Sequence, residues 1–138
     1  MYGYIDKSGT AVVQPHFDQA SHFYEGLAAV LAKNKWGFID TTGNWVIKPA
    51  FQDACGFSEG LAEVQVDERW GYVDTTGCLA IQPRFEAVGS FTEGQARCRV
   101  GEKWGFIDRK GSISIEPCFD FADSFHEGLA RFRGKNRE

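Results

Sequence analysis

The chain has 138 residues, of which 43% are hydrophobic and 25% are charged. This length suits one domain, residues 1–138, and the composition excludes a disordered chain. The longest apolar run, residues 27–32, is far shorter than the ~20 residues that a membrane-spanning helix needs. The net charge of −4 argues against general binding to nucleic acid. We therefore expect neither a membrane nor a nucleic acid as a partner.

A short pattern recurs at intervals of 34 residues: an aromatic residue, glycine, a second aromatic residue, an aliphatic residue and aspartate. Each copy is followed at fixed distances by a glycine, a proline, two phenylalanines and a Glu-Gly pair, so all four prolines share one position. Self-similarity at a fixed period predicts a repeat array. The four predicted repeats are residues 2–35, 36–69, 70–103 and 104–137.

The residues of each repeat favour β-structure over helix. Three glycines and a proline in each unit would cost the interior of a helix roughly 1 kcal/mol per glycine and 3 kcal/mol for the proline. Residues 61–66 instead alternate, with Ala62 and Val64 on one face and Glu63 and Gln65 on the other. The fold class predicted is therefore all-β.

In chain order, each repeat is expected to form three short antiparallel strands. A turn at residues 40–43 joins the first two strands of the second repeat, and Pro49 is expected to end the second strand because proline cannot donate to a sheet. The expected elements of this repeat are a first strand at residues 36–40, a second at 45–48, an irregular connector at 51–60 and a third strand at 61–66.

Strands without partners are expected at both ends of the chain, because the third strand of each repeat leads by a tight loop into the first strand of the next. Residues 2–6 form the earliest first strand and residues 129–133 the latest third strand. We expect an open, solenoid-like array, as in most repeat proteins. The alternative is a closed, propeller-like ring in which residues 129–133 pair with residues 2–6. The start at a repeat boundary also suits a segment of a longer array.

The repeated residues carry a family resemblance. They read Lys35-Trp36-Gly37-Phe38-Ile39-Asp40, Gly43, Ile47-Lys48-Pro49 and Phe57-Ser58-Glu59-Gly60-Leu61-Ala62. This pattern resembles the bacterial WG (KWG) β-repeat family over the whole chain. The resemblance implies a bacterial, non-catalytic module for interaction or ligand recognition, with neighbouring domains of a longer chain as further partners.

The carboxylates that recur in every repeat do not predict an active site. Glu25 and Asp6 each have equivalents in all four repeats, whereas an acid–base pair is normally built once. An aspartate that opens a turn accepts hydrogen bonds from backbone N–H groups, and one carboxylate per turn cannot supply the six or more oxygens that calcium takes. No nucleophile–base arrangement and no phosphate-binding loop is present. We predict no catalytic residue, no metal and no cofactor, and hence no enzyme.

Cysteine usage bears on the compartment. The four cysteines, at positions 55, 78, 98 and 118, show no Cys-x-x-Cys spacing and share no position of the repeat. Four free thiols suit a reducing compartment, and the N-terminus lacks the basic and apolar stretches of a secretory signal. The prediction for the chain as given is cytoplasmic, with two disulfides formed outside the cell as the alternative.

Differences between repeats indicate the candidate binding surface, since the shared framework cannot explain them. Four arginines occupy the positions expected to face outward on the third strands of repeats 3 and 4, and together they would recognise carboxylates or phosphates. The alternative is a solvated face that pairs with Glu102, Glu116 or Glu127. The arginines are Arg97, Arg99, Arg131 and Arg133.

Aromatic residues outside the repeated pattern give a second candidate surface. Tyr24 stands where other repeats carry Ser, Thr or His, so it is expected to be exposed and able to stack on a sugar. Trp45 and Phe132 replace aliphatic residues and are expected in the core. The predicted function is non-catalytic binding of a protein or peptide, and the alternative is a carbohydrate or cell-wall binding module.

Overall fold

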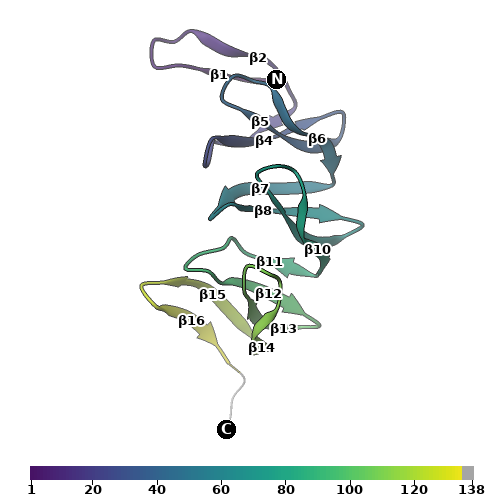
Figure 1. The fold of residues 1–138 in the computed structure, drawn as a ribbon, viewed down its shortest axis with the longest axis vertical. Helices are drawn as coiled ribbons and strands as arrows, with labels where there is room; N and C mark the ends of the chain where they lie inside the picture. Colours follow the sequence, from purple (N-terminus) through teal and green to yellow (C-terminus); the bar gives the residue numbers. More distant parts are fainter. Residues whose placement is uncertain (135–138) are drawn as a thin grey trace.

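The computed structural model describes residues 1–134, which form sixteen β-strands and no helix. The strands are stacked along one long axis, with β1 at one end and β16 at the other (Figure 1). Residues 135–137 of the predicted fourth repeat lie outside the described residues. The strands are β1 (Tyr2–Ile5), β2 (Ala11–Phe17), β3 (Gln19–Ala20), β4 (Leu27–Ala32), β5 (Lys35–Asp40), β6 (Trp45–Phe51), β7 (Asp53–Ser58), β8 (Leu61–Val66), β9 (Arg69–Asp74), β10 (Leu79–Phe85), β11 (Ala87–Val88), β12 (Ala96–Val100), β13 (Lys103–Ile107), β14 (Ile113–Phe119), β15 (Phe121–His126) and β16 (Leu129–Arg133).

The strands form three four-stranded sheets between two two-stranded ends. The complete sheets have the orders β3-β4-β5-β6, β10-β9-β8-β7 and β11-β12-β13-β14, and the end sheets are β1-β2 and β15-β16. Every pairing is antiparallel. The open array is confirmed. The ring alternative is wrong, because β1 pairs with β2 and β16 pairs with β15 at opposite ends of the molecule.

The connector between the second and third strands is more regular than the sequence indicated. Residues 53–58, expected to be irregular, form β7, whose Asp53 and Phe57 lie opposite Gln65 and Ala62 of β8. Each complete sheet therefore has four strands rather than three. The physical reason is that the second edge of β8 offers backbone hydrogen-bonding groups that need partners, whatever the side-chain pattern of the connector.

The proline of the repeat does not end its strand. β6 continues through Pro49 to Phe51, and the register shifts between the pair Phe38–Ile47 and the pair Trp36–Phe51. This irregularity brings the bulged strand close to Gly37, where a Cβ atom would lie 2.5 Å from the Ile47 carbonyl oxygen and 2.8 Å from the Pro49 nitrogen. The glycine that follows each repeated aromatic residue is therefore required by the close approach of two backbones.

In β4 and β8 the first four residues of the third strand are buried on both faces, which corrects the expectation of one outward face there, whereas β16 at the end of the array stays largely exposed. Ala29 of β4 has no exposed surface, and Glu63 of β8 is only 4% exposed. The reason is that the sheets stack on each other, so that one face contacts the preceding sheet and the other contacts the next. Phe38 of β5, for example, packs edge-to-face on Phe57 of β7 at a centroid distance of 5.0 Å.

The repeated aspartates are turn residues, as predicted. Asp40 Oδ1 accepts hydrogen bonds from Thr42 N at 2.9 Å, Thr42 Oγ1 at 2.6 Å and Asn44 N at 3.0 Å. The same arrangement recurs at Asp6 and Asp74. The hydrogen bond from Thr42 Oγ1, with those from the backbone, lowers the pKa of Asp40 below its ordinary value. These carboxylates therefore stabilise the turns of the repeats.

Candidate functional site

Arg97 belongs to the interface between the third and fourth repeats. It projects from β12, and its Nη1 donates to the Ala122 carbonyl oxygen at 3.0 Å. Its guanidinium carbon lies 5.0 Å from the Trp104 ring centroid and 5.6 Å from that of Phe121. The side chain is 26% exposed. Arg97 thus contributes cation–π and hydrogen-bonding contacts that join two repeats.

The other predicted arginines are partly neutralised. Arg131 Nε and Nη2 donate to Asp123 Oδ2 at 3.0 and 2.6 Å, and Asp123 also lies 4.0 Å from Arg97. Arg99 lies 3.5 Å from Glu86, which is also 3.7 Å from Arg69. The acidic partners are therefore Asp123 and Glu86, and not those considered from the sequence.

Arg133 of β16 is exposed, and within residues 1–134 it makes no ion pair. The structure brings Arg97 and Arg131 together around Asp123. It does not present four unpaired guanidinium groups.

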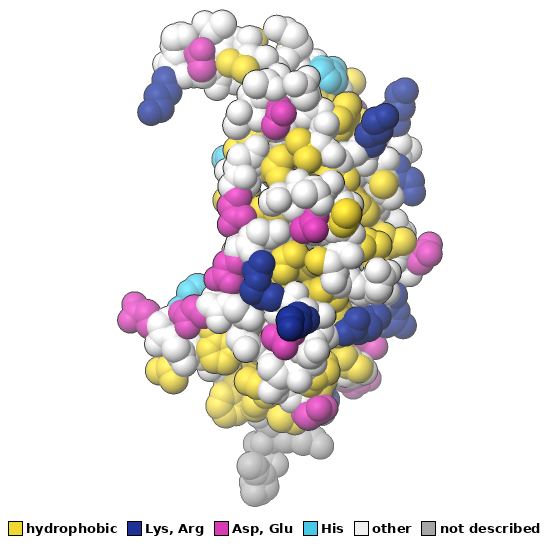
Figure 2. All heavy atoms as spheres, in the orientation of Figure 1, with side chains coloured by type: hydrophobic (Ala, Val, Ile, Leu, Met, Phe, Trp, Pro, Cys, Tyr) yellow, Lys and Arg dark blue, Asp and Glu magenta, His cyan; other side chains and the backbone are white. Residues whose placement is uncertain are grey.

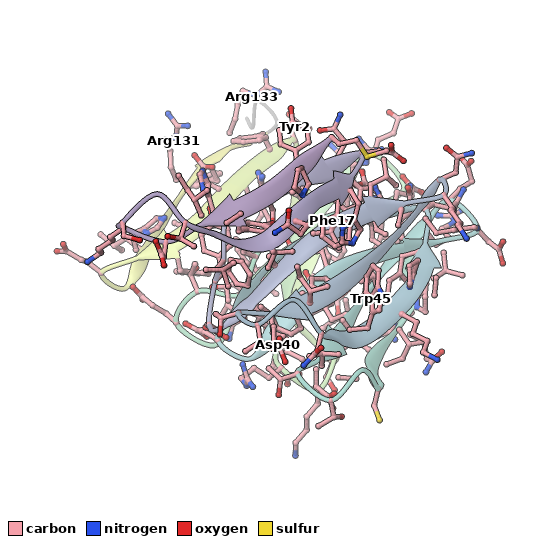
Figure 3. The ribbon with its side chains drawn as sticks, turned by 90° about the horizontal axis from the view of Figure 1, so that it is seen from above. Tyr2, Phe17, Asp40, Trp45, Arg131 and Arg133 are labelled. Atoms are coloured by element: carbon pink, nitrogen blue, oxygen red, sulfur yellow. The ribbon has the colours of Figure 1, made fainter. Side chains whose placement is uncertain are left out.

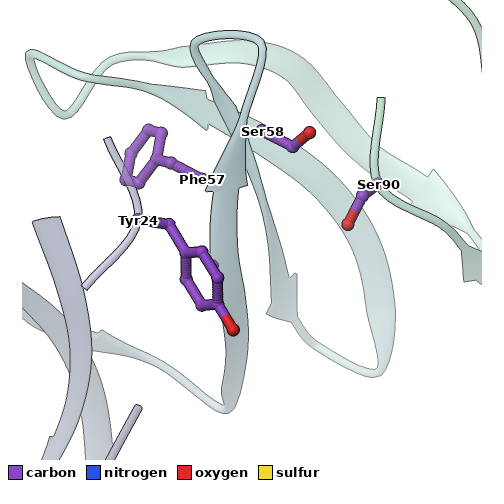
Figure 4. Close-up of a pocket in the computed structure, with 5 residues that line it drawn as sticks. Tyr24, Phe57, Ser58 and Ser90 are labelled. Carbon is purple, nitrogen blue, oxygen red and sulfur yellow. The ribbon is translucent and has the colours of Figure 1, made fainter. Parts of the chain in front are cut away.

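Tyr24 lies at a small pocket between repeats (Figure 4). The pocket has a volume of about 350 Å³ and is lined by Tyr24, Gly56, Phe57, Ser58 and Ser90. Tyr24 is 47% exposed, and one edge of its ring contacts Gly56, where a Cβ atom would lie 2.9 Å from Tyr24 Cε2. Ser58 Oγ donates to the Phe91 carbonyl oxygen at 2.7 Å. The pocket therefore combines an aromatic wall with small polar residues.

A buried carboxylate lies behind this pocket. Glu63 Oε2 accepts a hydrogen bond from Ser90 Oγ at 3.1 Å, while Glu63 Oε1 is buried without a partner among the described residues. Burial raises the pKa of Glu63 above its ordinary value, and Arg97 opposes that change. The low exposure of Glu63 favours its neutral form and distinguishes it from the turn carboxylates.

The largest cleft of those described lies at the other side of the array and was not predicted. It has a volume of about 730 Å³, and its apolar lining consists of Met1, Ala32, Trp45 and Pro49. Its polar lining comes from loops and strands of repeats 1 and 2: His16, Asp18, Lys33, Lys35 and Lys48. We call this site the lysine cleft. Viewed along the array, Trp45 lies on the opposite side from Arg131 and Arg133 (Figure 3).

The lysines of this cleft lack acidic partners. Within the described residues, no ion pair within 4.0 Å involves Lys33, Lys35 or Lys48. Residues 1–69 contain five basic residues against nine acidic ones, and these three lysines gather at one place. Figure 2 shows groups of Lys and Arg side chains along one edge of the array, with an acidic side chain between them, and several acidic side chains beside fewer basic ones along the hollowed opposite edge.

Trp45 is 38% exposed, so its expected place in the core was wrong. Its ring stands edge-to-face on buried Phe17 at a centroid distance of 5.7 Å and leaves the remaining surface to the cleft. Phe132, also expected in the core, is 60% exposed and packs on Phe119 at 4.9 Å.

Three of the equivalent positions in the next repeat have a different chemistry, whereas Arg69 keeps the positive charge of Lys35. Asp67 replaces Lys33, Leu79 replaces Trp45 and Gln82 replaces Lys48. The signal that could have found the cleft was therefore in the sequence, as a set of repeat-specific substitutions. What the sequence did not reveal is that a loop and a neighbouring strand place them around one hollow.

No thiol or metal cluster offers chemistry in the described part of the chain. All four cysteines are free, and burial raises the pKa of the Cys98 thiol to about 11. No group of three or more His, Cys, Asp or Glu residues between positions 1 and 134 is arranged to hold a metal ion. In the same range, no helix is long and apolar enough to cross a bilayer.

Stacked four-stranded sheets with a 34-residue period define an open, all-β repeat array. A family model for the WG-containing repeat matches four consecutive segments, residues 2–36, 36–70, 70–104 and 104–136. The chain belongs to the WG-repeat family. No curated protein and no solved structure matches it.

Proposed function

We propose that this WG-repeat module is non-catalytic and binds an acidic segment of a partner protein in the lysine cleft. The observation that carries the proposal is the gathering of three lysines without acidic partners around an exposed tryptophan. An extended peptide would place an apolar side chain against Trp45 and Pro49 while its carboxylates meet Lys33, Lys35 and Lys48. Aromatic anchors supply binding energy, and complementary charge supplies orientation and association rate.

The predicted arginine surface supports this function less well. Asp123 already accepts two hydrogen bonds from Arg131, and Arg97 is engaged by Ala122 and two aromatic rings. A ligand carboxylate would compete with Asp123 for Arg131 and with the Ala122 carbonyl oxygen for Arg97. In the lysine cleft, whose lining contains one acidic residue, Asp18, no ion pair within 4.0 Å among the described residues engages the three lysines, so less existing interaction is lost on binding.

The test is a titration with fluorescein-labelled synthetic peptides of alternating glutamate and leucine. We expect the acidic peptide to bind and the same peptide with glutamine for glutamate to bind at least roughly tenfold more weakly. The double variant Lys33→Glu, Lys48→Glu and the single variant Trp45→Ala should each weaken binding by roughly tenfold or more. Added salt should weaken the parent complex because exposed charges are screened.

The matched control is the double variant Lys7→Glu, Lys110→Glu. It changes the net charge by the same amount, but both lysines are exposed in aspartate turns away from the cleft lining. This control should bind like the parent. Equal losses in the two double variants would show a net-charge effect and contradict the cleft as the binding site, as would equal binding of the acidic and neutral peptides.

The Tyr24 pocket favours a second candidate function, binding of a carbohydrate. A half-exposed ring beside Ser58 and Ser90 offers a stacking face with hydroxyl groups next to it. Under this proposal, a cell-wall oligosaccharide binds the parent, and the variant Tyr24→Ala loses binding while Trp45→Ala keeps it. Absence of binding to a panel of such oligosaccharides would remove this candidate without affecting the peptide test.

A further inference from the structure

Consecutive repeats are joined by hydrogen bonds in which a glutamate carboxylate of one repeat accepts from backbone N–H groups of the next. The Glu25 carboxylate accepts hydrogen bonds from Glu59 N at 2.8 Å and Gly60 N at 2.9 Å. The Glu59 carboxylate accepts them from Glu93 N at 2.6 Å and Gly94 N at 2.9 Å, and Glu93 Oε1 accepts one from Gly128 N at 2.9 Å. Each Glu-Gly turn thus receives a carboxylate from the repeat before it and offers its own to the repeat after it.

The two ends of the array hold complementary halves of this contact. Among the described residues, nothing donates to the Glu127 carboxylate, and nothing accepts a hydrogen bond from Glu25 N or Gly26 N. Glu127 and Glu25 have the same left-handed turn conformation, with φ angles of 52° and 53°. One end therefore presents an acceptor and the other end presents the two donors that fit it.

The strand edges at the two ends are complementary as well. β8 pairs with β7 on one edge and β9 on the other, whereas within residues 1–134 its equivalent β16 pairs with β15 alone. β9 likewise lies between β8 and β10, whereas its equivalent β1 pairs with β2 alone in the described part of the chain. In β8, the edge equivalent to the free edge of β16 pairs with β9, the first strand of the next repeat. In β9, the edge equivalent to the free edge of β1 pairs with β8, the third strand of the preceding repeat.

The apolar side chains on these edges are exposed only at the ends. Leu129 is 79% exposed, whereas the equivalent Leu27 and Leu61 are 7% and 4% exposed. Ile5 is 71% exposed, whereas the equivalent Ile39 has no exposed surface. Covering such side chains stabilises an assembly because apolar surface is removed from water. An uncovered strand edge with apolar side chains favours pairing with another chain.

We propose that a second copy of this chain docks head-to-tail, with its β1 added to the free edge of β16. The two end sheets then merge into a four-stranded sheet of the same order as the three complete ones. A second copy of this chain fits the free edge of β16 because its β1 would repeat the pairing that the chain already makes between its own β8 and β9.

The register of the intermolecular pair follows from the repeat. Within the chain, Leu61 lies opposite Asp74 and Glu63 lies opposite Tyr72. Shifted by two repeats in each direction, Leu129 lies opposite Asp6 of the second copy, and Arg131 lies opposite Tyr4 of the second copy. The Glu127 carboxylate then accepts hydrogen bonds from Glu25 N and Gly26 N of that copy.

This contact is heterologous, so it does not stop at a dimer. Each added copy leaves a free β1 at one end of the assembly and a free β16 at the other, and further copies extend it. Seen along the array, Tyr2 lies close to Arg133 in projection, so both end strands occupy the same side of the molecule (Figure 3). A second copy displaced along the long axis can therefore meet β16 with β1.

The experiment measures the molar mass of the chain by light scattering over a wide range of concentration. The parent is expected to rise from the monomer mass of 15.4 kDa through successive multiples as concentration increases. Ile5→Lys blocks the β1 edge and Leu129→Glu blocks the β16 edge, where the new carboxylate faces Asp6 of the second copy. Both side chains are exposed in the monomer, so each variant should fold as the parent does.

Mixing the two variants tests the direction of the contact. Each variant alone should stay monomeric, whereas an equimolar mixture should form a species of twice the monomer mass and nothing larger. The dimer forms because β16 of the Ile5→Lys chain and β1 of the Leu129→Glu chain are both intact. A parent that stays monomeric at every concentration overturns the proposal, as does a mixture that gives no dimer or a single variant that still assembles. Circular dichroism of each variant confirms that the fold is retained.

Discussion

The carboxylate of Glu59 and the backbone N–H of Glu93 are hydrogen-bonded at 2.6 Å across the boundary between two repeats. Both residues have a φ of 53°, in the left-handed region where glycine or asparagine is the usual residue. A glutamate backbone is strained in this region. The hydrogen bonds that the Glu59 carboxylate accepts from Glu93 N and Gly94 N in the next turn offset this strain. The recurring Glu-Gly pair therefore has a structural role that neither residue type indicates by itself.

Replacing Glu59 with glutamine should destabilise the array. The amide keeps one acceptor but places an NH2 group against one of the two backbone N–H groups of Glu93 and Gly94, and the charge is lost. We expect the free energy of unfolding to fall by about 1–2 kcal/mol, measured by urea denaturation. The matched control is Glu127→Gln in dilute protein, which should change stability by less than about 0.5 kcal/mol. Equal losses in both variants would contradict the inter-repeat role.

Alanine at Gly37 should be much more damaging than alanine at a turn glycine. A Cβ at Gly37 would lie 2.5 Å from the Ile47 carbonyl oxygen and 2.8 Å from the Pro49 nitrogen, so the bulged strand would have to move. At Gly94 the space is open and only the φ of +77° opposes alanine. We expect Gly37→Ala to cost about 3 kcal/mol or more and Gly94→Ala about 1 kcal/mol, measured by thermal denaturation. Similar costs for both would refute the close approach.

The sequence predicted the array because residues with rigid backbone requirements recur at fixed positions. Gly43 and Asp40 specify a turn whatever the surroundings, and the aspartate hydrogen bonds follow from that turn. It did not predict β7, because that strand forms on the free backbone edge of β8 rather than through an alternating pattern. Nor did it predict that the bulge in β6 accommodates Pro49 within a strand.

The candidate sites depend on contacts between repeats, which explains why alternation alone misplaced them. Arg97 was assigned to an outward face, but that face meets the next repeat and its carbonyl acceptor at Ala122. Asp123, which binds Arg131, comes from the connector that the sequence left irregular. The lysine cleft joins Lys33 of one loop with Trp45 of a neighbouring strand, and only the folded register brings them together.

Replacing Glu63 with glutamine should change how stability depends on pH. Burial raises the pKa of Glu63 above its ordinary value of 4.5, so the folded state resists ionisation more than the unfolded state does. Stability from this group is therefore present at low pH and is lost as the pH rises through the folded pKa. We expect the stability of Glu63→Gln relative to the parent to increase from about pH 4 to about pH 8, measured by urea unfolding. The control is Glu68→Gln, which removes the same charge from an exposed position. A stability of Glu63→Gln relative to the parent that decreases with pH would contradict the burial of a neutral carboxyl.

Aspartates at the turns should give the opposite dependence on pH. The hydrogen bond from the threonine hydroxyl of each turn, with those from the backbone, lowers the pKa of Asp40 and Asp74 below the ordinary 3.8. Their contribution is present above the unfolded pKa and is lost as the pH falls through the lower folded value. Asparagine keeps the acceptor oxygen without the charge, so the double variant Asp40→Asn, Asp74→Asn should be less stable than the parent at neutral pH.

That difference in unfolding free energy should shrink towards zero in acid, where the parent carboxylates also become neutral. Urea unfolding of the parent and the double variant between about pH 2 and about pH 7 measures it. Glu102→Gln serves as the control, because its carboxylate makes no hydrogen bond or ion pair within residues 1–134. A difference that stays constant across this range would mean that the turns are stabilised by the geometry of the acceptor oxygen and not by its charge.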